Sequence, residues 1–328
     1  MEIDNPARLM EMVNGFRTSR IILTATALGV FDHLGGEGTG SSDLAGAVGT
    51  NPRATDRLLN ALAALGLLRK NREKFSNTPF SDKFLTRHSA SYLGGFELTN
   101  QMWTTWSTLT EAVVSGSTVV MESPINERPE AWQEAFIMAM HARAGQQAAE
   151  VADVLDLSNI RNMIDVGGGS GAYSFAMIRK QPDIRATVFD LPNIVPITRR
   201  YTEASGLSGQ VGIIPGNYLE DDFGTGYDLV LMSAIIHINS PEENRLLISK
   251  GAGALHPGGQ LVIIDHIMSE DRTAPAVGAL FAINMLVGTL NGDTYTENEI
   301  GCWMRDAGLK DIRLKETPSG VQVMTGLN

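Results

Sequence analysis

The sequence of 328 residues contains a single cysteine, Cys302, and aromatic residues make up only 6% of it. One cysteine cannot form an internal disulfide, which is typical of proteins of the reducing cytoplasm. The chain also lacks a run of about 18 apolar residues that could cross a bilayer, and it lacks an N-terminal stretch with the pattern of a signal peptide. We therefore expect a cytoplasmic protein that does not interact with a membrane.

Positive charge is scarce as well, because 26 Lys and Arg residues stand against 37 Asp and Glu residues, for a formal net charge of −11. This balance argues against a protein whose whole surface follows a nucleic-acid backbone. The six histidines and the cysteine show no metal-ligand spacing, so we expect no metal. With 43% hydrophobic residues, the chain is long enough for about two folded domains.

The stretch from Pro6 to about Leu34 contains apolar residues at helical spacing. They include Leu9, Met12, Val13, Phe16, Ile21, Ile22, Ala25, Leu28 and Phe31. A lone surface helix would carry a broad polar face, so this stretch is expected to pack against another helix or a second subunit. Core packing within one chain and a homodimer both fit the pattern.

The next segment has the order helix, turn, helix and hairpin. A capped helix begins at Ser41, a second helix is expected over Arg53 to Leu65, and a hairpin over Leu67 to Thr78. Residues 41–90 contain eight Lys or Arg and four Asp or Glu, a local balance of +4, so DNA binding by this winged-helix pattern is an alternative. The second helix offers few side chains that could recognise bases, which favours a structural role.

Residues from about 90 to 155 have a helical pattern that is rich in large side chains. Met and aromatic residues at helical spacing usually form core, but they also suit a wall that faces a flat aromatic ligand. We expect Phe136 and Met140 to line such a pocket.

A glycine-rich run over residues 164–171, Ile-Asp-Val-Gly-Gly-Gly-Ser-Gly, is the most informative motif of the chain. Apolar residues precede it like a buried strand, and residues 172–180 continue as a helix. Glycines allow a tight turn and let a cofactor approach the backbone beside the positive end of the helix dipole. Asp190 ends the next strand, where a carboxylate can accept hydrogen bonds from ribose hydroxyls. The motif therefore predicts a nucleotide-cofactor site.

Two cofactors compete for this motif. Gly167, Gly169 and Ala172 satisfy the dinucleotide fingerprint of an NAD enzyme, and Asp190 lies near the expected offset. The additional glycine at Gly171 favours S-adenosylmethionine as the ligand.

Strands and helices alternate after Asn159. The expected strands are Asn162 to Val166, Ala186 to Leu191, Val211 to Pro215, Tyr227 to Ser233, Gln260 to His266, Ile312 to Lys315 and Val321 to Met324. Alternation predicts a parallel sheet covered by helices on both faces. The last two strands are joined by a turn too short for a crossover helix, so they must pair antiparallel. We predict an α/β fold with a Rossmann-like seven-stranded sheet after a mainly helical winged-helix domain.

The chain resembles the S-adenosylmethionine-dependent small-molecule O-methyltransferases of the caffeate and hydroxyindole type. The motifs that carry the resemblance are residues 165–171, Phe189-Asp190-Leu191-Pro192, Gly216-Asn217-Tyr218-Leu219, His237, and Leu255-His256-Pro257-Gly258-Gly259. The resemblance implies a dimerisation domain over residues 1–95, a helical linker over 96–158 that contributes to the acceptor pocket, and a methyltransferase domain over 159–328. It also implies a homodimer that binds a small-molecule acceptor.

The resemblance further implies which residues bind the methyl donor. They are Asp165, Gly167, Gly169, Asp190, Leu191, Asn217, Tyr218 and Ser233. Gly167 and Gly169 would lie along the methionine portion, and Asp190 would bind the ribose hydroxyls. Asn217 stands where the family usually has Asp beside the adenine, and its amide oxygen can still accept a hydrogen bond.

His237 matches the general base of the family. A phenol has a reference pKa near 10, and imidazole, with a reference pKa near 6.5, can accept its proton during attack on the methyl group. Asp265 matches an acid that orients this histidine. The family usually continues as His-Asp-Trp, whereas this chain has Ile238 and Asn239, and a second family acid falls at about Thr294.

The acceptor pocket implied by the resemblance would be lined by Phe136, Met140, Phe281, Asn284 and Met285. An apolar pocket with few polar groups suggests a small aromatic or polyketide-like hydroxyl compound. C-methylation, a relative that binds the donor for other chemistry, and a DNA-binding regulator that senses a small ligand are the alternatives.

Overall fold

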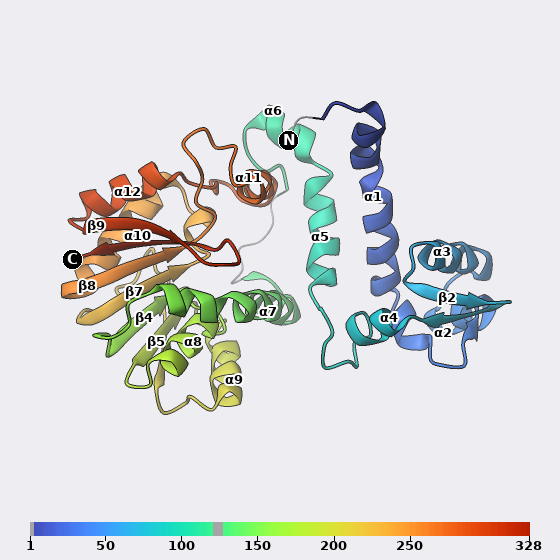
Figure 1. The fold of residues 1–328 in the computed structure, drawn as a ribbon, viewed down its shortest axis with the longest axis horizontal. Coiled ribbons are helices and arrows are strands. Elements are labelled where there is room, and N and C mark those ends of the chain that lie inside the picture. Colours follow the sequence, from blue (N-terminus) through green and yellow to red (C-terminus); the bar gives the residue numbers. More distant parts are fainter. Residues whose placement is uncertain (1–2, 121–126) are drawn as a thin grey trace. The chain divides into compact units, whose positions relative to one another are not determined.

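The computed structural model describes residues 3–120 and 127–328. The chain divides into two compact units, Met1–Trp103 and Thr104–Asn328, and each is described by itself (Figure 1). None of the helices within the described residues is long and apolar enough to cross a membrane.

The first unit is mainly helical. Its elements are α1 (Pro6–Ala27), a 3-10 helix (Val30–His33), β1 (Thr39–Gly40), α2 (Ser41–Val48), α3 (Pro52–Ala64), β2 (Leu68–Asn71), β3 (Lys74–Asn77), α4 (Pro79–Phe84) and most of α5 (Phe96–Trp106). Strands β1, β3 and β2 form a small antiparallel sheet in that order. The order of α2, α3 and the β2–β3 hairpin is the order predicted for a winged helix.

Helix α1 is shorter than the apolar pattern from Pro6 to Leu34 suggests. Asn5 caps its start, where the side chain accepts the N–H of Ala7, and Gly29 ends it with a φ of 68°. This left-handed conformation costs glycine little, so the chain turns there into the 3-10 helix.

The two ends of α1 have different surroundings within the first unit. Near its C-terminal end, Leu23 and Ala25 are buried, and Ala25 joins a core with Phe31, Leu59 and other apolar residues. Toward its N-terminus, Leu9, Met10, Met12, Val13 and Phe16 each expose between 49% and 61% of their surface. The N-terminal half of α1 therefore presents an apolar face that the first unit does not cover.

The second unit contains the alternating elements. They are α6 (Leu109–Ser115), α7 (Glu130–Val154), β4 (Asn162–Val166), α8 (Ala172–Lys180), β5 (Arg185–Asp190), α9 (Val195–Ser205), β6 (Val211–Pro215), β7 (Tyr227–Ser233), a 3-10 helix (Ile236–Ile238), α10 (Pro241–Ala254), β8 (Leu255–Ile264), α11 (Ala276–Gly288), α12 (Glu297–Asp306), β9 (Lys310–Glu316) and β10 (Gln322–Leu327).

The sheet of the second unit has seven strands in the order β6-β5-β4-β7-β8-β10-β9. The first five are parallel, while β10 runs antiparallel to both β8 and β9. The predicted fold class, a parallel sheet that ends in an antiparallel hairpin, is confirmed. Strand β8 begins earlier than expected, because Leu255 pairs with Tyr227 before a register shift that brings Gln260 opposite Leu229.

Helices cover both faces of this sheet (Figure 1). Along β4, Ile164 points to the side of α10 and α12, while its neighbour Met163 points to the side of α7 and α8. This alternation repeats in β7 and β8 because successive strand residues point to opposite faces. Both cores are apolar, so polar chemistry is concentrated at the carboxyl edge of the strands.

Candidate active site

The glycine-rich turn after β4 packs too tightly for side chains. Gly167, Gly169 and Gly171 have φ values of 67°, 56° and 79°, in the left-handed region that favours glycine. A Cβ atom on Gly167 would lie 2.8 Å from Cγ2 of Ile235, a residue close to His237 in sequence. The predicted cofactor loop and the segment that carries the predicted base are therefore in direct contact.

Asp165 lies beneath this turn, with only 1% of its surface exposed. Its Oδ2 accepts a hydrogen bond of 2.8 Å from the Ser174 hydroxyl, while its Oδ1 has no partner among the described residues. Burial raises the pKa of Asp165 to about 7. Because an unpaired buried oxygen is costly, Asp165 is suited to receive a donor or a positive charge from a ligand.

Asp190 connects the end of β5 to the same turn. One carboxylate oxygen accepts the N–H of Gly169 at 2.7 Å, and the other accepts the N–H of Leu191 at 2.7 Å. Burial raises the pKa of Asp190 to about 6, although these two N–H groups oppose the shift. The structure thus brings Asp165, Gly167, Gly169, Asp190 and Leu191 together at one edge of the sheet.

Ser233, at the end of β7, interacts with a residue that the sequence did not single out. The Tyr173 side chain, from the first turn of α8, is near enough to the Ser233 side chain for that group to lower its pKa. Burial raises the pKa of Tyr173, and the carboxylates of Asp165 and Asp265 act in the same direction. The Tyr173 hydroxyl therefore lies where the predicted donor residues meet the predicted base.

Asn217 and Tyr218 follow β6 and serve local structure. The Asn217 side-chain oxygen accepts the N–H of Leu219 at 3.1 Å, so it stabilises the turn it belongs to. The ring of Tyr218 packs against the core, and burial raises the pKa of its hydroxyl to about 12. That hydroxyl donates to Oδ1 of Asn239 at 3.1 Å, which ties this turn to the segment that carries His237.

His237 and Asp265 form a close pair between the 3-10 helix after β7 and the end of β8. The ring Nδ1 of His237 lies 2.8 Å and 3.0 Å from the two carboxylate oxygens of Asp265. The carboxylate also accepts the backbone N–H of His266 at 2.8 Å. Burial raises the pKa of Asp265, but the charge and hydrogen bond of His237 outweigh it and lower the pKa overall.

This geometry sets the roles of the two imidazole nitrogens. Asp265 has only 2% of its side chain exposed and stays ionised, so Nδ1 of His237 carries the proton that the carboxylate accepts. The Nε2 atom is then left with its lone pair, ready to accept a proton. The pair can therefore act as a base oriented by an acid.

A buried polar network fixes the segment just after His237. Tyr295 donates its hydroxyl hydrogen to the carbonyl of Asn239, and the Asn239 amide donates to Asn244 at 3.3 Å. Asn244 in turn donates to the carbonyl of Ile236 at 2.8 Å. Asn239 and Asn244 are 3% and 0% exposed, so these bonds are made without competition from water.

Comparisons with known proteins give this site its context. The sequence pattern of an O-methyltransferase domain matches residues 106–310, and that of an O-methyltransferase dimerisation domain matches residues 10–87. The chain belongs to the O-methyltransferase family. The 3-hydroxy-5-methyl-1-naphthoate 3-O-methyltransferase of Streptomyces sahachiroi is 31% identical over 317 residues, which cover 94% of this chain and 90% of that protein.

Solved O-methyltransferase structures share the whole fold. An O-methyltransferase family protein from Burkholderia thailandensis has a TM-score of 0.89 at 29% identity, and the match covers 100% of this chain and 99% of that one. Human N-acetylserotonin methyltransferase, solved in complex with S-adenosylmethionine, has a TM-score of 0.85 at 25% identity and covers 100% and 99%. This chain is an S-adenosylmethionine-dependent methyltransferase, and the prediction of a methyl donor over NAD is confirmed.

The predicted acceptor residues of this O-methyltransferase fall into two groups. On α11, the ring of Phe281 lies against His237, with centroids 4.8 Å apart and planes at 89°. Asn284 accepts a hydrogen bond of 2.9 Å from the Trp106 ring nitrogen, and Met285 is buried. On α7, Met140 is half-buried and Phe136 packs beside Leu191. Phe281 thus lies beside His237, whereas Phe136 lies near the end of β5.

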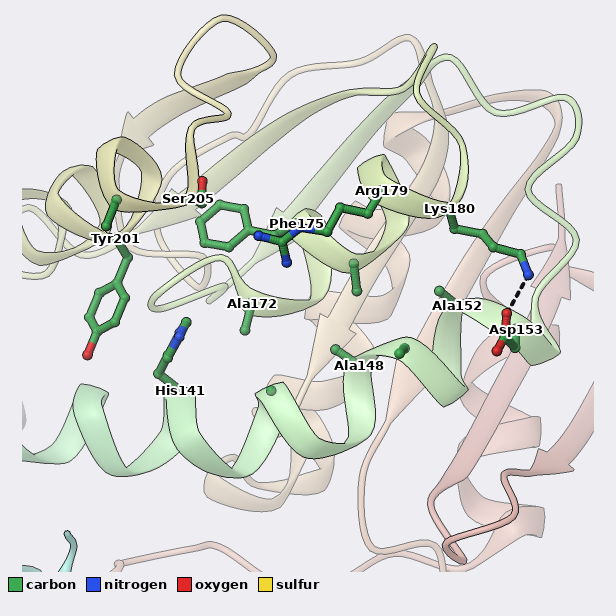
Figure 2. Close-up of a pocket in the computed structure, with 14 residues that line it drawn as sticks. His141, Ala148, Ala152, Asp153, Ala172, Phe175, Arg179, Lys180, Tyr201 and Ser205 are labelled. Carbon is green, nitrogen blue, oxygen red and sulfur yellow. Dashed lines mark hydrogen bonds and ion pairs between the residues drawn. The ribbon is translucent and has the colours of Figure 1, made fainter. Parts of the chain in front are cut away.

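A groove of about 590 Å³ lies between α7, α8 and α9 (Figure 2). His141 extends from α7 toward Tyr201 of α9, with ring centroids 4.3 Å apart, and its Nδ1 lies 2.8 Å from the hydroxyl of Ser170. At the other end of the groove, Lys180 of α8 pairs with Asp153 of α7. None of the predicted donor, base or acceptor residues lines this groove, so it is separate from the His237–Asp265 pair.

Sequence reasoning assigned no role to four polar residues around the site: Tyr173, Asn239, Tyr295 and His266. Each is placed by tertiary contacts rather than by a motif, although the position of Asn239 two residues after His237 was a usable signal. In residues 3–120 and 127–328, no three His, Cys, Asp or Glu side chains are grouped as metal ligands.

Proposed function

We propose that this O-methyltransferase transfers the methyl group of S-adenosylmethionine to a hydroxyl of a small aromatic molecule, with His237 as the general base. The observation that carries the proposal is the close pairing of His237 with the buried, ionised Asp265 at the carboxyl edge of the sheet. The naphthoate O-methyltransferase that resembles this chain supports a hydroxylated aromatic acceptor.

The donor side of the site fits the methyl donor. Asp190 would accept hydrogen bonds from the two ribose hydroxyls, and the unpaired Oδ1 of Asp165 would accept one from the ammonium group of the methionine portion. Gly167 and Gly169 form part of this turn and have no side chains, so the ligand can approach the backbone directly. S-adenosylmethionine supplies a methyl group on a sulfonium, which is a good leaving group.

His237 carries out the proton transfer in this scheme. Its Nε2 accepts the proton of the acceptor hydroxyl as the oxygen forms a bond to the methyl carbon and the carbon–sulfur bond breaks. Asp265 stabilises the resulting imidazolium through Nδ1–H, and the proton then passes to water. Phe281 limits the positions open to an aromatic acceptor beside the imidazole ring.

The apolar N-terminal half of α1 supports a homodimer. Its residues from Met10 to Phe16 lie within residues 10–87, which match the dimerisation domain of the family, and Met12 and Phe16 are more than half exposed. An isologous contact between two copies of α1 would cover these side chains.

A binding and turnover experiment tests the proposed function. The purified protein is titrated calorimetrically with S-adenosylhomocysteine, and methyl transfer from S-adenosylmethionine to a panel of naphthols and hydroxynaphthoates is then followed by mass spectrometry. We expect saturable binding and a product heavier by one methylene. Product formation at an undiminished rate by His237→Ala would show that His237 is not the base.

A further inference from the structure

Arg143 on α7 is an exposed cation that is hydrogen-bonded to a histidine beside Asp265. Its Nη2 lies 3.1 Å from Nε2 of His266, and no carboxylate within residues 3–120 and 127–328 forms an ion pair with it. By contrast, Arg272 forms two short bonds with Glu299, at 2.6 Å and 2.8 Å, and Arg200 pairs with Glu134. A guanidinium has five N–H donors, and here only one of its nitrogens has a described acceptor.

The position of Arg143 connects it to the base. His266 packs on Phe281 with ring centroids 4.5 Å apart, and the same Phe281 ring lies against His237. The charge of Arg143 also acts on the Tyr173 hydroxyl and lowers its pKa. Arg143 therefore lies on the acceptor side of the catalytic pair, one helical turn from Met140.

The positive charge of Arg143 is not balanced by its neighbours. Asp265, the carboxylate beside His266, is buried and already accepts hydrogen bonds from His237 and from the backbone of His266. Burial lowers the pKa of His266, and Arg143 lowers it further, although Asp265 opposes the shift. His266 is thus a neutral acceptor at pH 7, so the guanidinium keeps its full charge and unused donors.

We propose that Arg143 is the anchor of a carboxylate-binding subsite beside the His237–Asp265 pair, and that the methyl acceptor is a hydroxylated aromatic acid. This inference rests on the proposed function and adds the class of acceptor to it. An aromatic ring over Phe281 would place its hydroxyl at His237 and its carboxylate at the guanidinium, whose fork suits two oxygens. The methionine carboxylate of the donor has the same chemistry, so the test must separate the two sources.

The test compares binding of matched probes to the full chain. With S-adenosylhomocysteine present, 3-hydroxy-5-methyl-1-naphthoate and its methyl ester are titrated into the wild type, Arg143→Ala and Arg143→Lys. In a second arm, S-adenosylhomocysteine is compared with methylthioadenosine, which lacks the amino-acid carboxylate. Arg179→Ala is the matched control, because Arg179 is also an exposed arginine without a described ion pair, on the groove away from His237.

We expect the wild type to bind the acid roughly ten- to a hundredfold more tightly than the ester, as for a charge-assisted hydrogen bond. Arg143→Ala should abolish this preference, Arg143→Lys should keep part of it, and Arg179→Ala should leave it unchanged. A loss confined to S-adenosylhomocysteine, with methylthioadenosine unaffected, would assign the carboxylate to the donor and reject the aromatic acid.

Two preferences are measured: the acid over its methyl ester, and S-adenosylhomocysteine over methylthioadenosine. The proposed subsite is overturned if Arg143→Ala changes neither of them, or if the wild type shows neither of them. These readouts are affinities, whereas the proposed function is tested by turnover of His237→Ala. The failure of one can therefore be distinguished from the failure of the other.

Discussion

The two halves of the proposed active site, the donor half and the base half, are built in different ways. On the donor half, the glycine turn and Asp190 are held by backbone geometry, and their motifs match the family directly. On the base half, the chain departs from the family at Ile238, Asn239 and Thr294, yet His237 and Asp265 are still paired. Where backbone conformation positions a group, few residue types are tolerated at that position. Where side chains position it, different residues can supply different hydrogen bonds and still hold it in place.

Removal of the base should have the largest effect and should leave the donor half intact. His237→Ala is expected to lower kcat by roughly 10² to 10⁴, the usual contribution of a general base, with the affinity for S-adenosylhomocysteine unchanged. Turnover and calorimetry on the same preparation measure both. His256→Ala, on the exposed part of β8, is the control and should match the wild type. A weaker affinity in His237→Ala would show that the two halves are not separable.

Removal of the Asp190 carboxylate should weaken donor binding and leave kcat much less affected. Asp190→Ala is expected to weaken S-adenosylhomocysteine binding by roughly a hundredfold or more, because two hydrogen bonds to a charged group are lost. The His237–Asp265 pair does not depend on Asp190, so turnover at saturating donor should fall far less. Calorimetric titration measures the affinity, and near-UV circular dichroism checks that the glycine turn is still folded without the Asp190 bond to Gly169. An unchanged affinity would remove Asp190 from the donor site.

The polar network after His237 offers a sharper comparison. Tyr295→Phe removes the hydroxyl that donates to the carbonyl of Asn239, at a cost of about 1–3 kcal/mol for an unsatisfied buried acceptor. We expect kcat to fall about tenfold with KM for the donor unchanged, because His237 is less well positioned. Tyr227→Phe is the matched control, since Tyr227 donates to the Phe223 carbonyl in the same core. Equal losses of kcat in both variants, or none in Tyr295→Phe, would reduce the network to a purely structural role.

The smallest effect concerns pH. The pKa of Asp165 is raised to about 7 and that of Asp190 to about 6, so the unliganded protein retains protons on these groups that the unfolded chain has lost. Its stability should therefore rise as pH falls from about 7 toward 4. Binding of a donor with a positive charge favours the ionised carboxylates, so affinity should increase severalfold between pH 6 and pH 8.

Calorimetry in two buffers of different ionisation enthalpy checks this last prediction, because it counts protons released on binding. Asp165→Asn should abolish most of the release. Binding that weakens as pH rises would contradict the assignment of these carboxylates to the donor half.

Sequence reasoning was most successful where local pattern determines structure. Strands β4, β6 and β7 have the predicted bounds, because apolar runs between glycine and proline signals define them. The approach of Asp265 to His237 came from the family resemblance. By contrast, Tyr295 reaches Asn239 across 56 residues, and Arg143 reaches His266 across 123. Such contacts depend on how helices pack on the sheet, which no local spacing encodes.

The apolar half of α1 has a consequence for how this enzyme behaves in dilute solution. In the proposed homodimer, a second molecule would cover side chains such as Phe16, which is 53% exposed. Dimerisation stabilises the folded state in the same way as a bound ligand does, so the melting temperature should increase with the protein concentration. Abundance in the cell would in this way contribute to the lifetime of each copy.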